Sequence, residues 1–336
     1  MKPQVLVARL VFPEVVARLK SFFVVEDNPQ DRVFDKAELI RRLQGKQGAF
    51  ITGSERIDME VLAACPDLRA VCNMAVGFNN IDLAACTGKG VLCTNTPDVL
   101  TETTADFGFA LMMATARRIT EAEQFLRRGE WQKWSVGMFT GVDVHGTTLG
   151  ILGMGRIGQA IARRGAHGFG MNVLYHNRSR LDVSTESACR ATWVSKSDLL
   201  TRSDHLVIVM PYSPEAHHAV GAAELALMKQ SATLTNIARG GVVDDAALAR
   251  ALAAGKLAGA GLDVFEGEPA VHPDLLALSN VVLTPHIASA TGVTRRAMAN
   301  LAADNLIAAL GFGPDAGSPP SLLNPEVLRS PHQSAG

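Results

Sequence analysis

The segment Gly153-Met154-Gly155-Arg156-Ile157-Gly158 constrains the fold of this chain most strongly. It follows an apolar run at 149–152 and precedes a stretch typical of a helix at 159–164. Between a strand and a helix, the first glycine of such a turn permits the tight bend. The second lets the backbone approach a pyrophosphate, and the third lets the helix pack close to the strand. Phosphates would lie at the helix N-terminus, where free N–H groups and the helix dipole favour negative charge. The pattern therefore predicts a βα unit that binds a dinucleotide.

The strand expected next, at 172–176, ends at Asn177, 19 residues after the last of these glycines. An Asp or Glu here would accept hydrogen bonds from the ribose hydroxyls of NAD and would repel a 2′-phosphate. This chain instead has an uncharged Asn177, followed by Arg178, Ser179 and Arg180. Two guanidinium groups and a hydroxyl can bind a 2′-phosphate, so the sequence favours NADPH (NADP+) over NADH. The alternative is a solvated basic turn.

Composition limits the class of protein. A chain of 336 residues suggests about two domains. With 47% hydrophobic and 19% charged residues and a net charge of −1, it is typical of a soluble globular protein, and no basic patch indicates a nucleic acid partner. No apolar run reaches the roughly 18 residues of a membrane span, and the apolar N-terminal run is too short for a secretory signal. Five cysteines without a C-x-x-C pair indicate reduced thiols and no metal site, so we expect a cytoplasmic protein.

Two regions alternate between strands and helices. The first is a small α/β domain, with strands expected at 5–8, 49–52, 68–72 and 91–94 and helices at 14–22, 35–43 and 58–65. Residues 101–128 predict one long buried helix, which packs between the domains or also at a subunit interface. After the glycine turn, near-continuous apolar strands are expected at 205–210, 233–237, 259–264 and 281–284, as in a parallel sheet covered on both faces. A last helix at 292–310 leads to a Pro/Gly-rich tail whose end, Ser334-Ala335-Gly336, we expect to be loosely held.

Polar residues follow several of these strands. In an open parallel sheet, ligands bind outside the carboxyl ends of the strands. Those ends carry Met210-Pro211, then Arg239 in the segment 236–241, then Asp263 with Glu266 and Glu268 beyond it, then Pro285-His286. We therefore expect Arg239, Asp263, one of the two glutamates and His286 to lie together at the edge of the sheet where the dinucleotide binds.

Each of these residues also has a structural interpretation. Arg239 is a surface charge or, beside two glycines, a functional group close to another backbone segment. His286 is a core histidine or, in a tight loop, a catalytic one. Asp263 caps a loop or accepts the nicotinamide amide, and Glu268 is favoured over Glu266 because Pro269 restricts its backbone. The pair His217-His218 is expected to be solvated rather than metal-binding.

Together these motifs resemble the D-isomer-specific 2-hydroxyacid dehydrogenase family. The similarity covers 76–82, 153–158, 236–243, 261–265, Glu268-Pro269 and 285–289, and thus nearly the whole chain. Residues 101–106 and 129–131 are similar to the glyoxylate/hydroxypyruvate reductase B branch, also called 2-ketogluconate reductase. The resemblance implies an α/β fold with two domains. One is a Rossmann-type doubly wound parallel sheet at 100–287, and the other is a flavodoxin-like substrate-binding domain at 1–99 and 288–325, which the C-terminal helix completes.

The resemblance also implies roles for individual residues. Arg239 would bind the carboxylate and carbonyl oxygen of a 2-oxo acid, His286 would donate a proton, and Glu268 would pair with His286. The backbone N–H groups of Val76 and Gly77 would hold the carboxylate, and Trp134 would line the pocket of a partner subunit in a homodimer. The cofactor-binding set would be Thr104, Gly153, Met154, Gly155, Arg156, Ile157, Gly158, Asn177, Arg178, Ser179, Arg180, Met210, Pro211, Ile237, Ala238, Arg239, Asp263, His286 and Ser289.

The implied activity is the NADPH-dependent reduction of small 2-oxo acids, such as glyoxylate, hydroxypyruvate or 2-ketogluconate, to D-2-hydroxy acids. An NAD-dependent dehydrogenase with another substrate range is the alternative within enzymes. A non-enzymatic, nucleotide-sensing protein similar to a corepressor is the alternative outside them.

Overall fold

The computed structural model describes residues 2–329, which form two compact units. The first unit contains the chain up to Leu100 together with the chain from Thr291 onward, and the second is Thr101–Ala290. The sequence placed these boundaries after residues 99 and 287. The loose end expected at 334–336 lies outside the described residues.

The sheet of the first unit is parallel throughout, in the order β2-β1-β3-β4-β5. This is the flavodoxin-like order, in which the direction of winding switches between β1 and β3. The strands are β1 Gln4–Val7, β2 Val24–Asp27, β3 Gly48–Ile51, β4 Ala70–Asn73 and β5 Leu92–Thr94. The helices are α1 Pro13–Phe22, α2 Lys36–Leu43, α3 Met59–Ala64, α4 Leu83–Gly88, α13 Gly292–Ala309 and the 3-10 helix η3 Pro325–Arg329.

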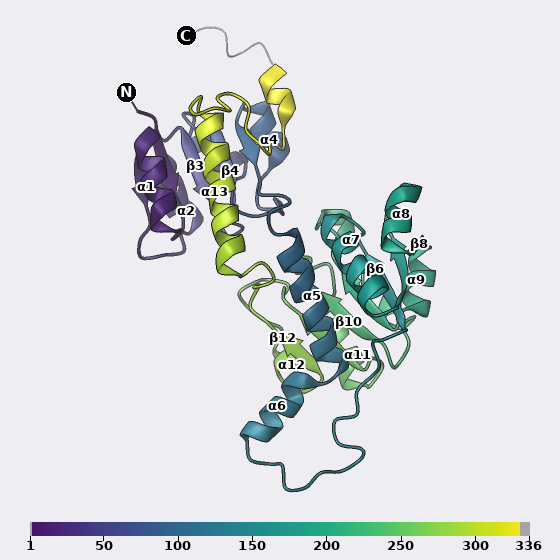
Figure 1. Cartoon of the computed structure of the whole chain (residues 1–336). Coiled ribbons are helices and arrows are strands. Elements are labelled where there is room, and N and C mark those ends of the chain that lie inside the picture. Colours follow the sequence, from purple (N-terminus) through teal and green to yellow (C-terminus); the bar gives the residue numbers. More distant parts are fainter. Residues whose placement is uncertain (1, 330–336) are drawn as a thin grey trace. The chain divides into compact units, whose positions relative to one another are not determined.

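The last long helix of the chain completes the core of this first unit. Helix α13 packs against β3 and β4 (Figure 1). Its small residues Ala299 and Ala302 and the larger Leu306 share one core with Val5 and Phe50. The C-terminal helix therefore packs on the N-terminal sheet.

The second unit contains a parallel sheet in the order β8-β7-β6-β9-β10-β11-β12 among the described residues. This is the Rossmann order, with its switch point between β6 and β9. The strands are β6 Thr148–Leu152, β7 Asn172–His176, β8 Ala191–Trp193, β9 His205–Ile208, β10 Thr233–Asn236, β11 Gly259–Leu262 and β12 Val281–Leu283. The helices are α5 Thr101–Ala116, α6 Ile119–Arg127, α7 Arg156–Arg163, the π-helix η1 Arg164–Gly168, α8 Val183–Cys189, α9 Lys196–Arg202, the 3-10 helix η2 Pro214–Ala216, α10 Ala222–Leu225, α11 Asp245–Ala253 and α12 Pro273–Leu276. The predicted doubly wound α/β architecture is confirmed.

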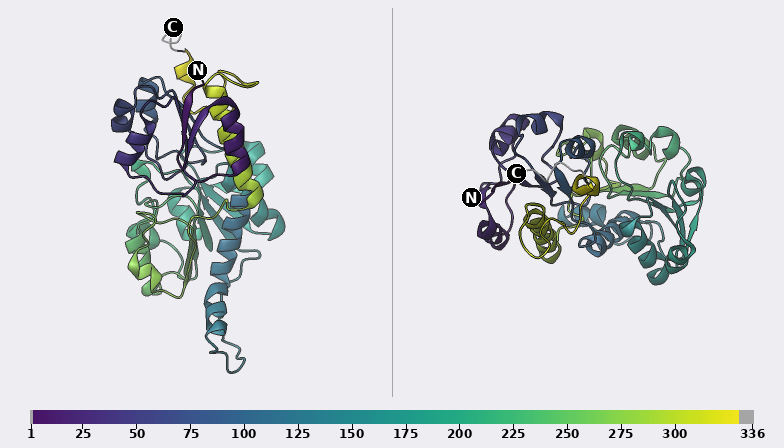
Figure 2. Two further views of the ribbon diagram at one scale, coloured as in Figure 1. Left: turned by 90° about the vertical axis from the view of Figure 1, so that its left-hand side faces the viewer. Right: turned by 90° about the horizontal axis from the view of Figure 1, so that it is seen from above.

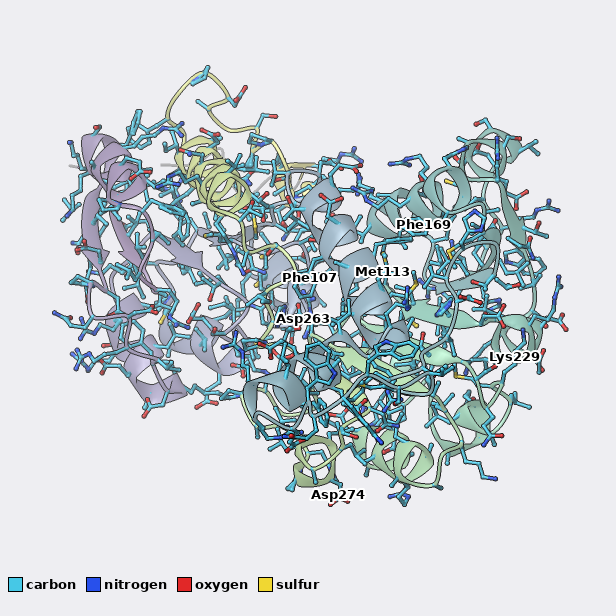
Figure 3. All side chains as sticks on the ribbon, turned by 60° about the horizontal axis from the view of Figure 1, so that its bottom comes forward. Phe107, Met113, Phe169, Lys229, Asp263 and Asp274 are labelled. Carbon is cyan, nitrogen blue, oxygen red and sulfur yellow. The ribbon has the colours of Figure 1, made fainter. Side chains whose placement is uncertain are left out.

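Helices cover both faces of this sheet, so its central strands β9, β10 and β11 are buried on both sides. Helix α5 packs against α7, β10 and β11 within the unit. Phe107 and Met113 of α5 and Phe169 pack against the core on that face (Figure 3). This burial explains why α5 has almost no polar face.

The long helix predicted at 101–128 is wrong, because the chain breaks into α5 and α6. Arg118 adopts a left-handed backbone conformation with φ of 52° between the two helices. The carbonyl of Ala116 accepts the N–H of Val142, 2.9 Å away, so the returning chain satisfies the end of α5. No residue of α6 is buried, and α6 extends with the following loop away from the sheet of its unit (Figure 2).

Within residues 2–329, none of the helices has both the length and the apolar character that crossing a bilayer demands.

Candidate active site

The three glycines of the turn after β6 have different surroundings, which explain the need for glycine at each position. Gly153 has φ of 103°, and a Cβ on it would lie 2.5 Å from the backbone nitrogen of Met210. A Cβ on Gly158 would lie 2.5 Å from the carbonyl oxygen of Gly153. A Cβ on Gly155, by contrast, would meet no atom within 4 Å, and helix α7 begins at the next residue, Arg156. The first and third glycines are therefore required by packing, and the second leaves open the space that a pyrophosphate needs at a helix N-terminus.

The residues after β7 that were expected to bind a 2′-phosphate differ in their contacts and exposure. The side-chain oxygen of Asn177 accepts the N–H of Met154 at 2.6 Å, which ties the end of β7 to the glycine turn. Arg178 and Ser179 are exposed. Arg180 instead makes two hydrogen bonds to Glu186, of 2.9 and 2.7 Å. Arg180 thus already has a carboxylate partner, which the sequence did not reveal, and Arg178 is left as the candidate phosphate ligand.

The turn after β10 presents Arg239. Its guanidinium Nη1 donates to the carbonyl of Ala238 at 2.7 Å, and the side chain is partly buried. A Cβ on Gly240 would lie 1.7 Å from the carbonyl oxygen of Phe265, so this turn lies directly on the segment that follows β11. The close backbone approach inferred from the two glycines is present. Burial lowers the pKa of Arg239, and the negative charge of Glu268 counteracts this effect.

His286 and Glu268 form a hydrogen-bonded pair. The imidazole Nδ1 lies 2.8 Å from Glu268 Oε2, and the other oxygen, Oε1, accepts the N–H of Phe265 at 2.9 Å. Because a carboxylate only accepts, Nδ1 must donate, which leaves Nε2 to hold or release the exchangeable proton. Burial by itself would raise the pKa of Glu268. The hydrogen bonds from His286 and Phe265 and the charge of Arg239 outweigh burial and lower it. The structure thus brings His286 and Glu268 into contact, and Arg239 follows the neighbouring strand β10.

Asp263 contacts the loop that carries His286. Its side chain is fully buried and accepts hydrogen bonds from the loop that carries His286. The donors are the Thr284 hydroxyl and the Ile287 N–H to Oδ1, at 2.7 and 2.8 Å, and the Ala288 N–H to Oδ2, at 2.8 Å. Burial raises the pKa of Asp263, and these three hydrogen bonds counteract only part of the shift. The sequence left two roles open for Asp263, capping a loop or accepting the nicotinamide amide. The hydrogen bonds from Thr284, Ile287 and Ala288 show that Asp263 caps a loop.

The other predicted cofactor residues of the second unit surround the same strand ends. Met210 is partly buried and Pro211 is exposed after β9, Ile237 and Ala238 are buried after β10, and Ser289 is partly buried. Thr104 is buried on α5, and its hydroxyl has no hydrogen-bond partner among the described residues. A buried hydroxyl of this kind fits a site that a ligand amide completes.

In the first unit, two asparagines shape the turn at Val76 and Gly77. Asn95 donates to the carbonyl of Val76 at 2.8 Å, and Asn73 donates to the carbonyl of Gly77 at 2.9 Å. Neither N–H of this pair donates to another group in the described part of the chain, which leaves both able to bind an anion. Neither asparagine was predicted from the sequence. Each lies at or just after the end of a strand, and polar residues at strand ends were the signal that predicted the site in the second unit.

Trp134 lies in the loop after α6, and its exposed fraction is 73%. Within the described chain no residue closes over it, and its predicted role toward a second subunit stays a prediction.

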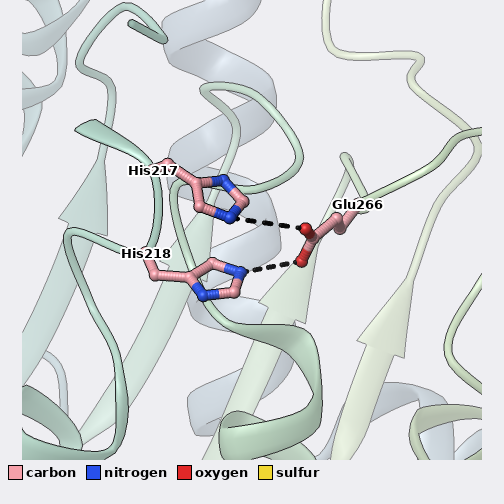
Figure 4. Close-up of side chains that lie close together, drawn as sticks. All are labelled: His217, His218 and Glu266. Atoms are coloured by element: carbon pink, nitrogen blue, oxygen red, sulfur yellow. Dashed lines mark hydrogen bonds and ion pairs between the residues drawn. The ribbon is translucent and has the colours of Figure 1, made fainter. Parts of the chain in front are cut away.

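His217 and His218 lie beside Glu266, which the sequence did not connect with them (Figure 4). His218 Nε2 is 2.9 Å from Glu266 Oε2, and His217 Nε2 is 3.8 Å from Oε1. The two rings are stacked, with centroids 3.9 Å apart and planes inclined by 21°. Nearly parallel rings do not direct their nitrogen lone pairs at one ion about 2.0–2.1 Å away, so the geometry favours ion pairing over metal binding.

Comparison with known proteins identifies similar sequences and structures. Residues 109–288 match the model of the D-isomer specific 2-hydroxyacid dehydrogenase, NAD binding domain. The chain is 46% identical to the glyoxylate reductase of Thermococcus kodakarensis over 98% of both chains. The NADPH-dependent glyoxylate/hydroxypyruvate reductase of Sinorhizobium meliloti, solved with NADP and malonate, has a TM-score of 0.85 and 35% identity and covers 96% of this chain and 97% of its own.

A glyoxylate reductase from Paecilomyes thermophila has a TM-score of 0.86 and 31% identity, with 97% of this chain and 99% of that chain covered. The similarity therefore extends over both units and not only over the nucleotide-binding sheet. On the family match, the near-complete coverage and the paired His286 and Glu268 beside Arg239, this chain belongs to the D-isomer-specific 2-hydroxyacid dehydrogenase family.

Proposed function

We propose that this protein reduces small 2-oxo acids to D-2-hydroxy acids, with NADPH as the preferred hydride donor. The observation that carries the proposal is the grouping of Arg239, Glu268 and His286 at the strand ends that also hold the glycine turn. We assign dinucleotide binding to the second unit and substrate binding to the first. Glyoxylate, hydroxypyruvate and 2-ketogluconate are the candidate substrates, as in the branch that the motifs resemble. Two similar proteins support this range: one relative is a glyoxylate reductase, and one similar solved structure is a glyoxylate/hydroxypyruvate reductase.

Each residue of the site has a task in this reaction. Arg239 binds the substrate carboxylate and carbonyl oxygen, where a preorganised positive group contributes on the order of 3–4 kcal/mol to the transition state. In the first unit, the N–H groups of Val76 and Gly77 are the proposed ligands of a carboxylate. Bound NADPH supplies the hydride that the carbonyl carbon accepts. His286 gives its Nε2 proton to the carbonyl oxygen, a contribution of about 10²–10⁴ in rate, and Glu268 orients the ring and stabilises the imidazolium.

Preference for NADPH rests on the segment after β7. Asn177 places no negative charge near the ribose, and Arg178 with Ser179 provides an exposed cation and hydroxyl for a 2′-phosphate. Arg180 has less weight in the proposal than the sequence suggested, because Glu186 already pairs with it.

A substrate panel tests the proposal. Steady oxidation of NADPH is expected with glyoxylate and at least one longer 2-oxo acid, with a lower kcat/KM for NADH. Stoichiometric NADPH binding without turnover would instead favour the corepressor-like alternative. Turnover with NADH alone would favour an NAD-dependent dehydrogenase.

A further inference from the structure

The loop that carries His286 has an unusual backbone. His286 lies in the left-handed region, with φ of 55°, although it is not a glycine. A side chain in this region persists only where surrounding contacts hold the backbone in place. The side chain of His286 is itself about half exposed, so the contacts that fix it must come from the loop and from Glu268.

Asp263 supplies contacts on both sides of His286. Its carboxylate accepts from Thr284, two residues before the histidine, and from the N–H groups of Ile287 and Ala288, directly after it. Three of the roughly four acceptor positions of a carboxylate are thus filled by one loop. Since the side chain is fully buried, water does not compete for these hydrogen bonds.

The same residue begins the segment that leads to Glu268. Asp263 directly follows β11, and Glu268 lies five residues further along the chain. The two members of the proton-donating pair therefore come from neighbouring strand ends that Asp263 joins at their base. We propose that Asp263 is a positioning residue for the proton donor: its carboxylate fixes residues 284–288 and thereby the direction in which the His286 imidazole leaves the chain. This inference rests on the proposed function, because it assigns His286 the donation of a proton.

Asp263→Asn is the direct test. The two residues have the same shape, but the asparagine amide presents N–H groups at one of the two oxygen positions. In either orientation, one backbone N–H of the loop, that of Ile287 or that of Ala288, loses its acceptor. We expect faster amide exchange across 284–290, by at least about ten-fold, as local opening becomes easier. The kcat at saturating NADPH and glyoxylate should fall by about 10², because the donor is misplaced. The Kd of NADPH should stay near the wild-type value.

Asp245→Asn is the matched control. Asp245 is also a buried carboxylate and accepts a backbone N–H, that of Glu266 at 3.0 Å, but it makes no hydrogen bond to the His286 loop. This variant should keep the wild-type exchange at 284–290 and the wild-type kcat. Thr284→Val removes one donor and leaves the carboxylate, so it should give a smaller acceleration of exchange at the same residues. If Asp263→Asn does not fold, Thr284→Val alone tests whether the contacts of Asp263 hold the His286 loop in place.

Two results would overturn the assignment. One is unchanged exchange at 284–290 in Asp263→Asn, or in Thr284→Val where the first variant does not fold. The other is a weakened Kd for NADPH with wild-type kcat at saturation, the pattern of a nicotinamide ligand. If the wild-type protein reduces no 2-oxo acid, the proposed function fails, whereas the exchange comparison, which needs no turnover, still decides what Asp263 holds in place.

Discussion

Glu268 accepts a hydrogen bond from His286 and is affected by the charge of Arg239, the two residues on which the proposed chemistry depends. Arg239 follows β10 and His286 follows β12, and the carboxylate between them comes from the segment after β11. One of its oxygens accepts from His286 and the other from the Phe265 backbone, so the carboxylate cannot rotate without losing a hydrogen bond. The lowered pKa of Glu268 favours its ionised form.

Glu268→Gln should shift the pH profile of reduction. Reduction takes up one proton together with the hydride, so the rate of reduction falls at high pH. A neutral amide no longer favours the imidazolium, and we expect this alkaline limb of kcat/KM for the 2-oxo acid to move to lower pH. Glu266→Gln is the matched control, since Glu266 pairs with His218 and should leave the limb in place. An unmoved limb in Glu268→Gln would remove Glu268 from the proton transfer.

The two arginines after β7 should give opposite results. Arg178→Ala should raise the KM of NADPH by roughly ten-fold or more, the loss of a charge-assisted hydrogen bond, and leave the KM of NADH unchanged. Arg180→Ala should instead lower the thermal midpoint slightly, because Glu186 loses its cation, with little effect on either KM. Equal effects of both variants on the NADPH KM would mean that Arg180 leaves Glu186 when the cofactor binds.

This difference could not be predicted from the sequence. Arg180 and Glu186 are six residues apart and lie on either side of the start of α8, so no helical spacing suggests their contact. Arg239, Glu268 and His286 were predictable, because they follow parallel strands whose ends must share one edge. The buried contacts of Asp263 were not, since they depend on the conformation of a loop.

The strand–turn–helix unit at β6 and α7 is specified mainly by its glycines. Gly155→Ala should leave the free energy of unfolding almost unchanged, because its Cβ would meet open space, and should weaken NADPH binding by filling that space. Gly158→Ala should cost about 1–3 kcal/mol of stability, since its Cβ would lie 2.5 Å from a backbone oxygen. Denaturant unfolding and fluorescence titration of both variants measure the two quantities. Wild-type NADPH affinity in Gly155→Ala would contradict the phosphate site at this turn.

Elements with strong apolar patterns were predicted close to their observed bounds, and weakly patterned ones were missed. Strand β2 was not predicted because none of its residues is fully buried. The break between α5 and α6 was missed because no Gly or Pro lies between Ala116 and Ile119. That break depends on a contact with Val142, which is distant in sequence, so local propensity could not indicate it.

The whole molecule combines two doubly wound units and an exposed apolar surface on the second. Exposed apolar side chains gather on α6 and the loop after it, namely Ile119, Leu126, Trp131, Trp134 and Val136. An exposed apolar group of this kind marks an interaction surface. The family resemblance implied a homodimer, and we expect a second copy of this chain as the occupant.

Light scattering after size exclusion tests this expectation. The wild-type protein should elute as a dimer, and Leu126→Asp should shift it toward the monomer by placing a charge in the apolar surface. Leu276→Asp, at an equally exposed leucine on α12, should remain dimeric. A wild-type protein that is monomeric and fully active would contradict both the dimer and the predicted role of Trp134.

The proposed reaction depends on a proton that His286 gives to a substrate bound by Arg239. The most direct measurement is kcat for glyoxylate reduction at saturating NADPH in wild type and His286→Gln, with His272→Gln as the control. We expect kcat to fall by a factor of about 10²–10⁴ in His286→Gln and to stay unchanged in the control. A His286→Gln enzyme that turns over at the wild-type rate would contradict it.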